Sequence, residues 1–170
     1  MKRRLFSVVL LGGVVSAFLL SRNPQSTIYP NVIMPMMKTL LDPETAHHLT
    51  IKIAKYHLYP KQKKKDSEIL RVHVFGQEFP NPLGLAAGFD KNGEAMEALS
   101  DLGFGFVEIG SITPKPQPGK PKPRLFRLVE DEAIINRYGF NSEGSEVVEK
   151  RLKEFRKRGK KIIVGVNLGK

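Results

Sequence analysis

Three runs of apolar residues alternate with amphipathic segments in the second half of the chain. The runs are Leu83–Ala87, Phe104–Ile109 and Ile162–Leu168, and each is almost continuously apolar. Between them, Glu94–Leu102 and Ser145–Arg158 carry apolar side chains at helical spacing. Strands that are apolar on both faces are typical of parallel sheets covered by helices. The sequence therefore predicts an α/β fold built on a parallel sheet.

Small and polar residues gather at the carboxyl end of each of the three predicted strands. These strand ends are Ala86–Gly88, Gly110–Ser111 and Asn167–Gly169. In doubly wound sheets and (β/α)8 barrels, ligands bind at the carboxyl ends of the strands. Small residues allow a flat ligand to lie against the backbone, and Lys91 places a cation beside the first strand end. We therefore expect a ligand site at this edge of the sheet.

Two helices are predicted before the sheet. They span roughly Ile33–Leu41 and Pro43–Leu58, and Asp42 between them is a suitable N-cap. The first helix is rich in methionine, whose flexible, polarisable side chain suits an adaptable apolar groove. Packing of an ordinary helical hairpin on a core explains the same pattern. The lysine-rich segment 61–65 then marks a boundary before a short strand pair around Gly76.

The first 22 residues form a separate unit. Basic residues precede a 16-residue apolar run from Leu5 to Leu20, and Asp42 is the first acidic residue of the chain. As a helix this run would be about 24 Å long, somewhat short of the ~30 Å hydrocarbon core of a bilayer. A cleaved secretory signal has a similar basic start and apolar middle. The absence of acidic residues over the first forty residues, however, suits mitochondrial import. We expect a retained membrane anchor behind a short import signal.

Charge and composition exclude several classes of site. The net charge is +11, which is compatible with nucleic acid, an anionic membrane surface or an anionic small ligand. Nucleic-acid binding is disfavoured because tryptophan is absent and the other aromatic residues are not interleaved with arginine. The absence of cysteine excludes disulfides and thiol chemistry, and the four histidines show no metal-ligand spacing. We expect no metal site.

A long basic segment, Ser111–Phe140, separates the second predicted strand from the second helix. Five prolines stiffen its first part, which is consistent with a rigid solvated loop. The segment ends in Asn136-Arg137-Tyr138-Gly139-Phe140, where an amide stands beside aromatic residues and a glycine. An amide can both donate to and accept from a planar polar ring. This end of the segment is therefore a candidate binding element.

Four motifs, taken together, resemble those of one enzyme family. GLAAGFDKNGEA, FGFVEIGSITPKPQPGKPKPRLFRL, INRYGFNSEG and GVNLGK occur in this order and spacing. They are similar to motifs of the membrane-bound, quinone-dependent class 2 dihydroorotate dehydrogenases, and the resemblance runs from about Met34 to Lys170. It implies an FMN-dependent (β/α)8 barrel that oxidises dihydroorotate to orotate and passes the electrons to ubiquinone. Mitochondrial members carry an import signal and an inner-membrane anchor, which residues 1–22 fit.

The resemblance also implies roles for individual residues. Those that would contact FMN lie at the three strand ends and are Ala87, Gly88, Phe89, Asp90, Lys91, Ser111 and Asn167. Those that would hold the pyrimidine are Asn136, Arg137, Tyr138, Gly139 and Phe140, together with Lys91. The Lys91 ammonium would reach both the flavin and the carboxylate of the substrate, and would stabilise negative charge on the flavin ring.

The helical hairpin would form the mouth through which ubiquinone reaches the flavin from the bilayer. Polar positions of this tunnel are matched by His47 and Arg127, and its apolar lining by Met34, Met37, Pro43, Ala46 and Leu49. The expected organisation is a targeting segment, anchor and linker at 1–30, the membrane-associated hairpin at 31–60, and part of the barrel at 61–170. The expected partners are dihydroorotate or orotate, ubiquinone and lipid of the inner mitochondrial membrane, without nucleic acid or an obligate protein partner.

Three strands predict an incomplete barrel, because a complete one needs roughly 250 residues. We therefore expect a fragment, a short isoform or an incomplete gene model. By resemblance, the catalytic serine base lies on a strand-end loop beyond Lys170, so no catalytic residue is assigned to this chain. Two hypotheses follow: the amino-terminal part of an active class 2 enzyme, or a truncated, membrane-anchored product without activity. A soluble class 1 enzyme is disfavoured because it gives residues 1–58 no role.

Overall fold

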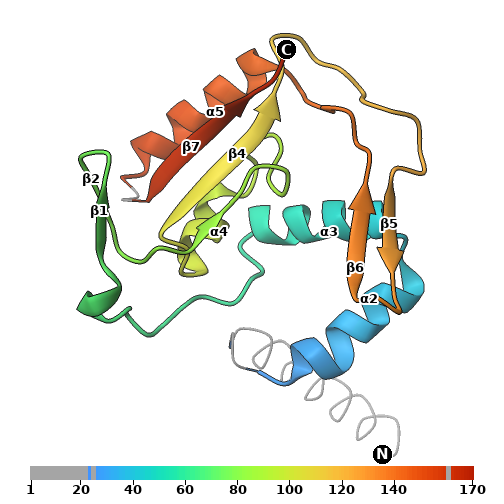
Figure 1. Cartoon of the computed structure of the whole chain (residues 1–170), viewed down its shortest axis with the longest axis horizontal. Coiled ribbons are helices and arrows are strands. Elements are labelled where there is room, and N and C mark those ends of the chain that lie inside the picture. The colour runs from blue at the N-terminus through green and yellow to red at the C-terminus, as the bar shows by residue number, and fades with distance from the viewer. Residues whose placement is uncertain (1–22, 24–25, 160–161) are drawn as a thin grey trace, which may run out of the picture.

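The computed structural model describes residue 23, residues 26–159 and residues 162–170, and the expected membrane anchor lies outside them. Its centre is a parallel sheet of three strands in the order β3 (Gly84–Leu85), β4 (Phe106–Ile112) and β7 (Ile163–Leu168) (Figure 1). The predicted α/β class and the parallel pairing of the three apolar runs are confirmed. Strand β3 is shorter than predicted, since regular pairing ends at Leu85, before the first small residues.

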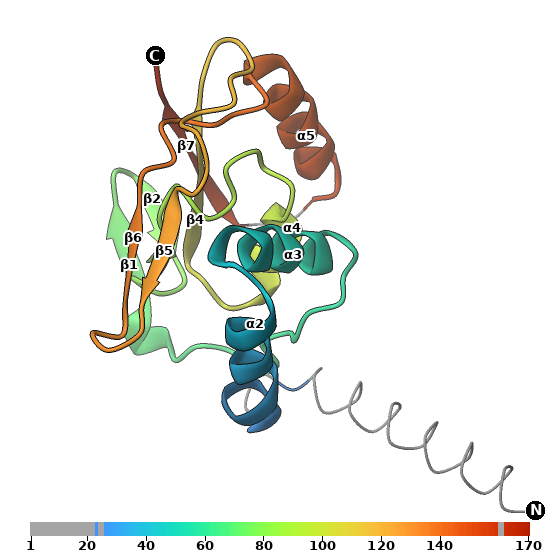
Figure 2. The ribbon, with the colours of Figure 1, turned by 90° about the vertical axis from the view of Figure 1, so that its right-hand side faces the viewer.

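Helices cover one face of this sheet. Figure 2 shows α3 (Pro43–Lys55), α4 (Met96–Asp101) and α5 (Ser145–Lys157) on the same side of β4 and β7. Val107 and Ile109 of β4 are completely buried in a core shared with these three helices. Alternate residues of a strand point to opposite faces, so Phe106 and Glu108 face away from the helices. Burial of a large aliphatic side chain stabilises a fold by about 1.5–3 kcal/mol.

The predicted pair of amino-terminal helices is confirmed. A π-helical turn at Tyr29–Ile33 runs into α2 (Met34–Leu40), and α3 begins at Pro43. The Asp42 carboxylate accepts hydrogen bonds from the backbone N–H groups of Glu44 and Thr45, both at 3.1 Å. The predicted N-cap is therefore formed. Among the helices of the described ranges, none combines the length and the apolar character that crossing a bilayer requires.

Helix α3 ends earlier than predicted, at Lys55 rather than Leu58. Tyr56 leaves the helical conformation and His57 adopts a φ of 59°, which reverses the chain. Tyr59 then turns back into the core, where its hydroxyl donates to Asp101 at 2.8 Å. The apolar residues after Lys55 therefore serve the loop and not the helix.

Two short antiparallel hairpins accompany the sheet. The predicted strand pair around Gly76 is present as β1 (Val72–Val74) and β2 (Gln77–Phe79), preceded by a 3-10 turn at Glu68–Leu70. The Phe79 and Phe106 rings pack edge-on, with their centroids 5.6 Å apart. The second hairpin was not predicted.

This second hairpin consists of β5 (Leu125–Leu128) and β6 (Ala133–Asn136), and it lies inside the segment expected to be a loop. Its strands have four residues each. The many prolines and lysines before Leu125 obscured this short alternating pattern. Figure 1 shows the hairpin beside α3 and α2, far along the chain from both.

Gly105 provides a test of how tightly β4 starts against the preceding chain. A Cβ atom at this position would lie 2.1 Å from the backbone oxygen of Asn81. Asn81 cannot retreat, because its side chain is buried and bonded to Asp66, Gly103 O and the N–H of Leu83. We expect Gly105→Ala to lower the free energy of unfolding by about 2–3 kcal/mol through overpacking, as measured by urea denaturation.

The matched control is Gly165→Ala on the neighbouring strand β7. A Cβ atom there would lie at an ordinary 3.4 Å from Glu108 Cγ. Equal unfolding midpoints for the two variants would show that Asn81 moves aside, contrary to this expectation.

Candidate functional site

The three predicted strand ends meet at one edge of the sheet. The N–H of Gly88, after β3, donates to the Gly110 carbonyl of β4 at 2.8 Å. The N–H of Gly110 in turn donates to the Asp90 carbonyl at 3.2 Å. These bonds hold the loop after β3 against the end of β4.

A chain of side-chain hydrogen bonds joins the same strand ends. The Ser111 hydroxyl donates to Asn167 Oδ1, and Asn167 Nδ2 donates to Glu108 Oε1 at 3.3 Å. The other oxygen of Glu108 accepts the N–H of Ala87 at 3.3 Å. One carboxylate therefore orients groups on both neighbouring strands. Sequence reasoning missed Glu108, although it is the one charged residue inside the apolar run Phe104–Ile109.

The loop after β3 leaves space in front of the backbone. Gly88 has a φ of 113°, and a Cβ atom there would meet nothing within 4 Å. A larger residue would be strained at this φ and would fill that space. Just after the candidate pyrimidine segment, Asn141 Oδ1 is buried without a hydrogen-bond partner among the described residues. The open backbone at Gly88 suits a flat ligand, and the unsatisfied acceptor of Asn141 suits a partner that carries an N–H group.

Asp90 stabilises this loop through hydrogen bonds to the start of α4. Its side chain is only 1% exposed, and its two oxygens accept the N–H groups of Glu94 and Ala95, each at 2.8 Å. Burial raises the pKa of Asp90, while the two hydrogen bonds oppose the shift. The carboxylate thus faces the start of α4, and the residue meets the strand ends through its backbone.

Lys91 lies against an aromatic ring of the candidate pyrimidine segment. Its ammonium is 4.5 Å from the ring centroid of Tyr138, a cation–π distance. Burial lowers the pKa of Lys91, and the nearby charge of Arg124 lowers it further. The predicted cofactor lysine and the predicted pyrimidine segment are therefore in direct contact.

His47 of α3 links the helical hairpin, formed by α2 and α3, to the loop after β3 and to the candidate pyrimidine segment. Its Nε2 donates to the Phe89 carbonyl at 2.7 Å, because a carbonyl can only accept. In the neutral ring Nδ1 is then an acceptor, and it receives the Tyr138 hydroxyl at 3.2 Å. Burial lowers the pKa of His47 and favours this neutral form. Burial also raises the pKa of Tyr138 to about 12, so that the hydroxyl retains the proton it donates.

A buried ion pair lies beside this contact. Glu44 of α3 and Arg124, just before β5, are 4% and 8% exposed, and Arg124 Nη2 lies 2.7 Å from Glu44 Oε1. Burial alone would raise the pKa of Glu44, but hydrogen bonds from Arg124, Lys122 and His48 outweigh it and hold the pKa at about 2. Sequence reasoning missed this pair, since 80 residues separate its members and each resembles an exposed charge.

The structure brings together only part of the candidate pyrimidine segment. Tyr138 is buried, whereas Asn136 is exposed on β6 and Arg137 donates to the Pro123 carbonyl. Phe140 has a φ of 57°, and its ring lies close to Gly169: a Cβ there would be 3.4 Å from Phe140 Cδ1 and 3.6 Å from Ser111 Cβ. The segment therefore reaches the strand ends through Tyr138 and Phe140, with Gly139 between them.

The candidate quinone residues lie on the hairpin and on β5. Arg127 Nη1 donates to the carbonyls of Lys38 and Leu41, at 3.1 and 2.8 Å, and so attaches β5 to the end of α2. Met34 and Leu49 are 46% and 38% exposed. Of the remaining members, Met37 and Pro43 are half-buried and Ala46 is buried. The helical hairpin of α2 and α3 therefore presents apolar surface, and His47 and Arg127 add polar groups to this region.

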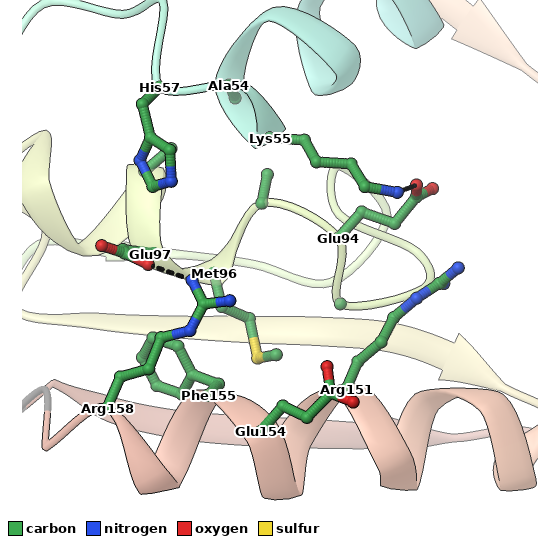
Figure 3. A pocket seen from close by; sticks show the side chains of 13 residues that line it. Ala54, Lys55, His57, Glu94, Met96, Glu97, Arg151, Glu154, Phe155 and Arg158 are labelled. Atoms are coloured by element: carbon green, nitrogen blue, oxygen red, sulfur yellow. Dashed lines mark hydrogen bonds and ion pairs between the residues drawn. The ribbon is translucent and has the colours of Figure 1, made fainter.

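A cavity of about 240 Å³ lies elsewhere, where the end of α3 meets α4 and α5 (Figure 3). Met96 and Phe155 contribute apolar surface to it, while Lys55–Glu94 and Arg158–Glu97 form ion pairs at its rim. None of the predicted site residues lines it. We interpret it as a junction between helices. In the part of the chain that the structure describes, no group of three or more side chains is arranged to hold a metal ion.

Comparisons with known proteins identify the family. A family model described as dihydroorotate dehydrogenase matches residues 69–170. The mouse protein named dihydroorotate dehydrogenase (quinone), mitochondrial, is 46% identical over 99% of this chain and 45% of its own length. Dihydroorotate dehydrogenase (quinone) of Rhizobium rhizogenes is 57% identical over 76% of this chain and 35% of its own length.

A solved structure shows the same relationship. The crystal structure of DHODH from Eimeria tenella in complex with ferulenol superposes with a TM-score of 0.74 at 47% identity, covering 82% of this chain and 39% of that one. The chain thus spans less than half the length of these relatives. It belongs to the dihydroorotate dehydrogenase family, and it corresponds to the amino-terminal part of members named as quinone enzymes.

Proposed function

We propose that this chain forms the amino-terminal part of an FMN-dependent (β/α)8 enzyme that oxidises dihydroorotate to orotate and passes the electrons to ubiquinone. The observation that carries the proposal is the meeting of three segments at Tyr138. Lys91 of the first strand end lies 4.5 Å from its ring, and His47 of the hairpin accepts its hydroxyl at 3.2 Å. Cofactor, substrate and quinone elements would thereby share one contact.

The residues at the strand ends fit FMN. The open backbone at Gly88 leaves room for a flat ring, and Ser111 and Asn167 supply polar groups beside it. Ala87, Phe89, Asp90 and Lys91 complete the proposed contacts from the loop after β3. When bound, FMN would supply the redox chemistry, taking up two electrons from the substrate in the form of one hydride.

The pyrimidine would lie beside both Lys91 and the segment Asn136–Phe140, which contact each other at Tyr138. Its carboxylate pairs with the Lys91 ammonium, whose partial burial strengthens this attraction relative to water. The Tyr138 ring packs against the Lys91 ammonium, and the Phe140 ring lies close to Gly169 at the third strand end. Asn136 and Arg137 would turn toward the ring when it binds.

The quinone would enter along the hairpin. His47 and Arg127 offer polar contacts, and Met34, Met37, Pro43, Ala46 and Leu49 offer an apolar path between the bilayer and the flavin. We propose residues 1–30 as import signal, single-pass anchor and linker, residues 31–60 as this membrane-associated hairpin, and residues 61–170 as part of the barrel. The protein would then work at the inner mitochondrial membrane, without nucleic acid or an obligate protein partner.

We assign no catalytic base to this chain. A base must lie within hydrogen-bond reach of the proton it removes, and Ser111 already donates to Asn167. Ser142 is occupied as well, since its hydroxyl accepts the N–H groups of Thr113 and Gly144. The second candidate function is accordingly a membrane-anchored product without activity.

Activity measurements distinguish the two candidates. We expect the 170-residue chain to show no dihydroorotate-dependent reduction of a soluble ubiquinone. The same chain joined to the part of the mouse relative that follows the matched region should bind FMN, become yellow and turn over. In that fusion protein, Lys91→Met should reduce kcat/KM by at least about a hundredfold, because it removes the cation that the carboxylate needs.

Lys55→Met is the matched control, since Lys55 pairs with Glu94 at 3.1 Å and is not one of the proposed site residues. Turnover by the chain alone would contradict the absence of a base. A fusion protein that binds FMN but stays inactive would favour the second candidate.

A further inference from the structure

We propose that Arg124, clamped by Glu44, is a positioning residue that holds Tyr138, and through it Lys91, so that docking of helix α3 sets the geometry of the segment 136–140. The proposal rests on the proposed function only in treating Lys91 and this segment as the substrate side. Sequence reasoning assigned no role to either member of the ion pair.

Arg124 is immobilised by partners on every side of its guanidinium group. Nε and Nη2 donate to the Glu44 carboxylate, at 3.2 and 2.7 Å. Nη1 donates to the carbonyls of Pro118 and Lys120 in the proline-rich loop. A planar guanidinium that is used in this way has one orientation, which a lysine cannot reproduce. The residue therefore fixes the loop, the start of β5 and helix α3 relative to one another.

Tyr138 is held by the same group of residues. Its ring centroid lies 5.1 Å from Arg124 Cζ, and its carbonyl accepts the N–H of Lys120 at 2.9 Å. The carbonyl of Arg124 accepts the N–H of Arg137, directly before the tyrosine, at 2.8 Å. Arg124 thus positions the ring with its side chain and the adjoining backbone with its carbonyl.

Glu44 is needed because two cations share one ring. Arg124 and Lys91 both lie against Tyr138, and the charge of Arg124 lowers the pKa of Lys91. Glu44 opposes this effect, since its charge raises the pKa of Lys91. Without the carboxylate, the two cations would repel each other in a partly buried space. Helix α3 therefore contributes the charge that keeps Lys91 and Tyr138 together.

The full 170-residue chain allows a direct test without any ligand. With lysines labelled with carbon-13 at Cε, the Lys91 signal should be displaced upfield by the Tyr138 ring current, and Lys91→Arg identifies it. We expect Glu44→Gln to move this signal to the position of the exposed lysines. It should also accelerate hydrogen exchange of the Arg137 and Lys120 amides at least about tenfold.

Arg124→Lys retains a cation beside Glu44 but loses the paired N–H donors of the guanidinium group. It should move the Lys91 signal part of the way toward the position of the exposed lysines. Glu94→Gln is the matched control, because Glu94, in the loop before α4, also pairs with a residue of α3, Lys55, at 3.1 Å. It should leave the Lys91 signal and both amides unchanged.

The proposal is overturned if Glu44→Gln, or Arg124→Lys where the first variant does not fold, alters only α3 signals and leaves Lys91 and the two amides as in the wild type. It is overturned equally if Glu94→Gln has the same effect as Glu44→Gln. Loss of the proposed enzyme activity would not affect these readouts, so failure of the two proposals can be told apart.

Discussion

Replacing Glu44 with alanine should lower the free energy of unfolding by about 3 kcal/mol. The substitution leaves the Arg124 guanidinium buried without an anion, and an uncompensated buried charge costs about 3–5 kcal/mol. We expect the lower end of this range, because the nearby Lys122 side chain is 65% exposed and water can approach. Urea denaturation followed by circular dichroism measures the effect.

Two further variants separate the charge from the packing. Glu94→Ala removes the exposed pair with Lys55 and should cost less than about 1 kcal/mol. The double variant E44M/R124M removes both charges and should recover most of the stability that E44A loses. If E44A were no less stable than Glu94→Ala, the ion pair would contribute nothing to the attachment of α3.

Acid should remove the same contribution. The ordinary pKa of Glu44 is 4.5 and the folded value is about 2, so the carboxylate stabilises the folded state fully above pH 4.5. This stability is lost as the pH falls through 2. The difference between the wild type and E44A should therefore narrow between pH 4.5 and 2. A constant difference over this range would show that ionisation of Glu44 does not cause the stabilisation.

Replacing Asp90 with alanine should cost about 3 kcal/mol. The change leaves the N–H groups of Glu94 and Ala95 without an acceptor at the buried start of α4. Each buried donor left unpaired costs about 1–3 kcal/mol. Since Asp90 also fixes the loop before Lys91, the variant should increase hydrogen exchange in residues 87–95 together with the loss of stability.

Asp90→Asn is the informative control. It keeps one acceptor oxygen and the volume of the side chain, so the loss should fall to roughly half of that for alanine. Equal losses in Asn and Ala would mean that the negative charge, and not the number of acceptors, carries the stabilisation.

The sheet and its helices could be predicted from the sequence because their signals are local. Val107 and Ile109 belong to an apolar run whose length suits a strand, and the spacing of Val148 and Phe155 suits one face of a helix. The boundaries were less accurate. Where α3 ends is decided by the burial of Tyr59 against α4, a contact between distant parts of the chain.

The position of the candidate site could be predicted from the sequence, but only some of its residues could. Ser111 and Asn167 lie in the last residues of β4 and β7, Lys91 lies in the loop after β3, and all three are recognisable by position. Glu44 and Arg124 become recognisable only when the structure shows their ion pair, because each is surrounded in the sequence by ordinary polar residues. The contact between His47 and Tyr138 likewise depends on the unpredicted β5–β6 hairpin, which brings the segment back toward α3.

The attachment of α2 bears on how this region can change during evolution. Arg127 reaches α2 through the main-chain carbonyls of Lys38 and Leu41, and a carbonyl is present whatever side chain stands there. Helix α3, in contrast, is attached through the specific side chains Glu44 and His47. Substitutions along α2 can therefore accumulate without loosening its anchorage, and the surface of α2 can diverge between species while the interior beneath α3 stays constrained.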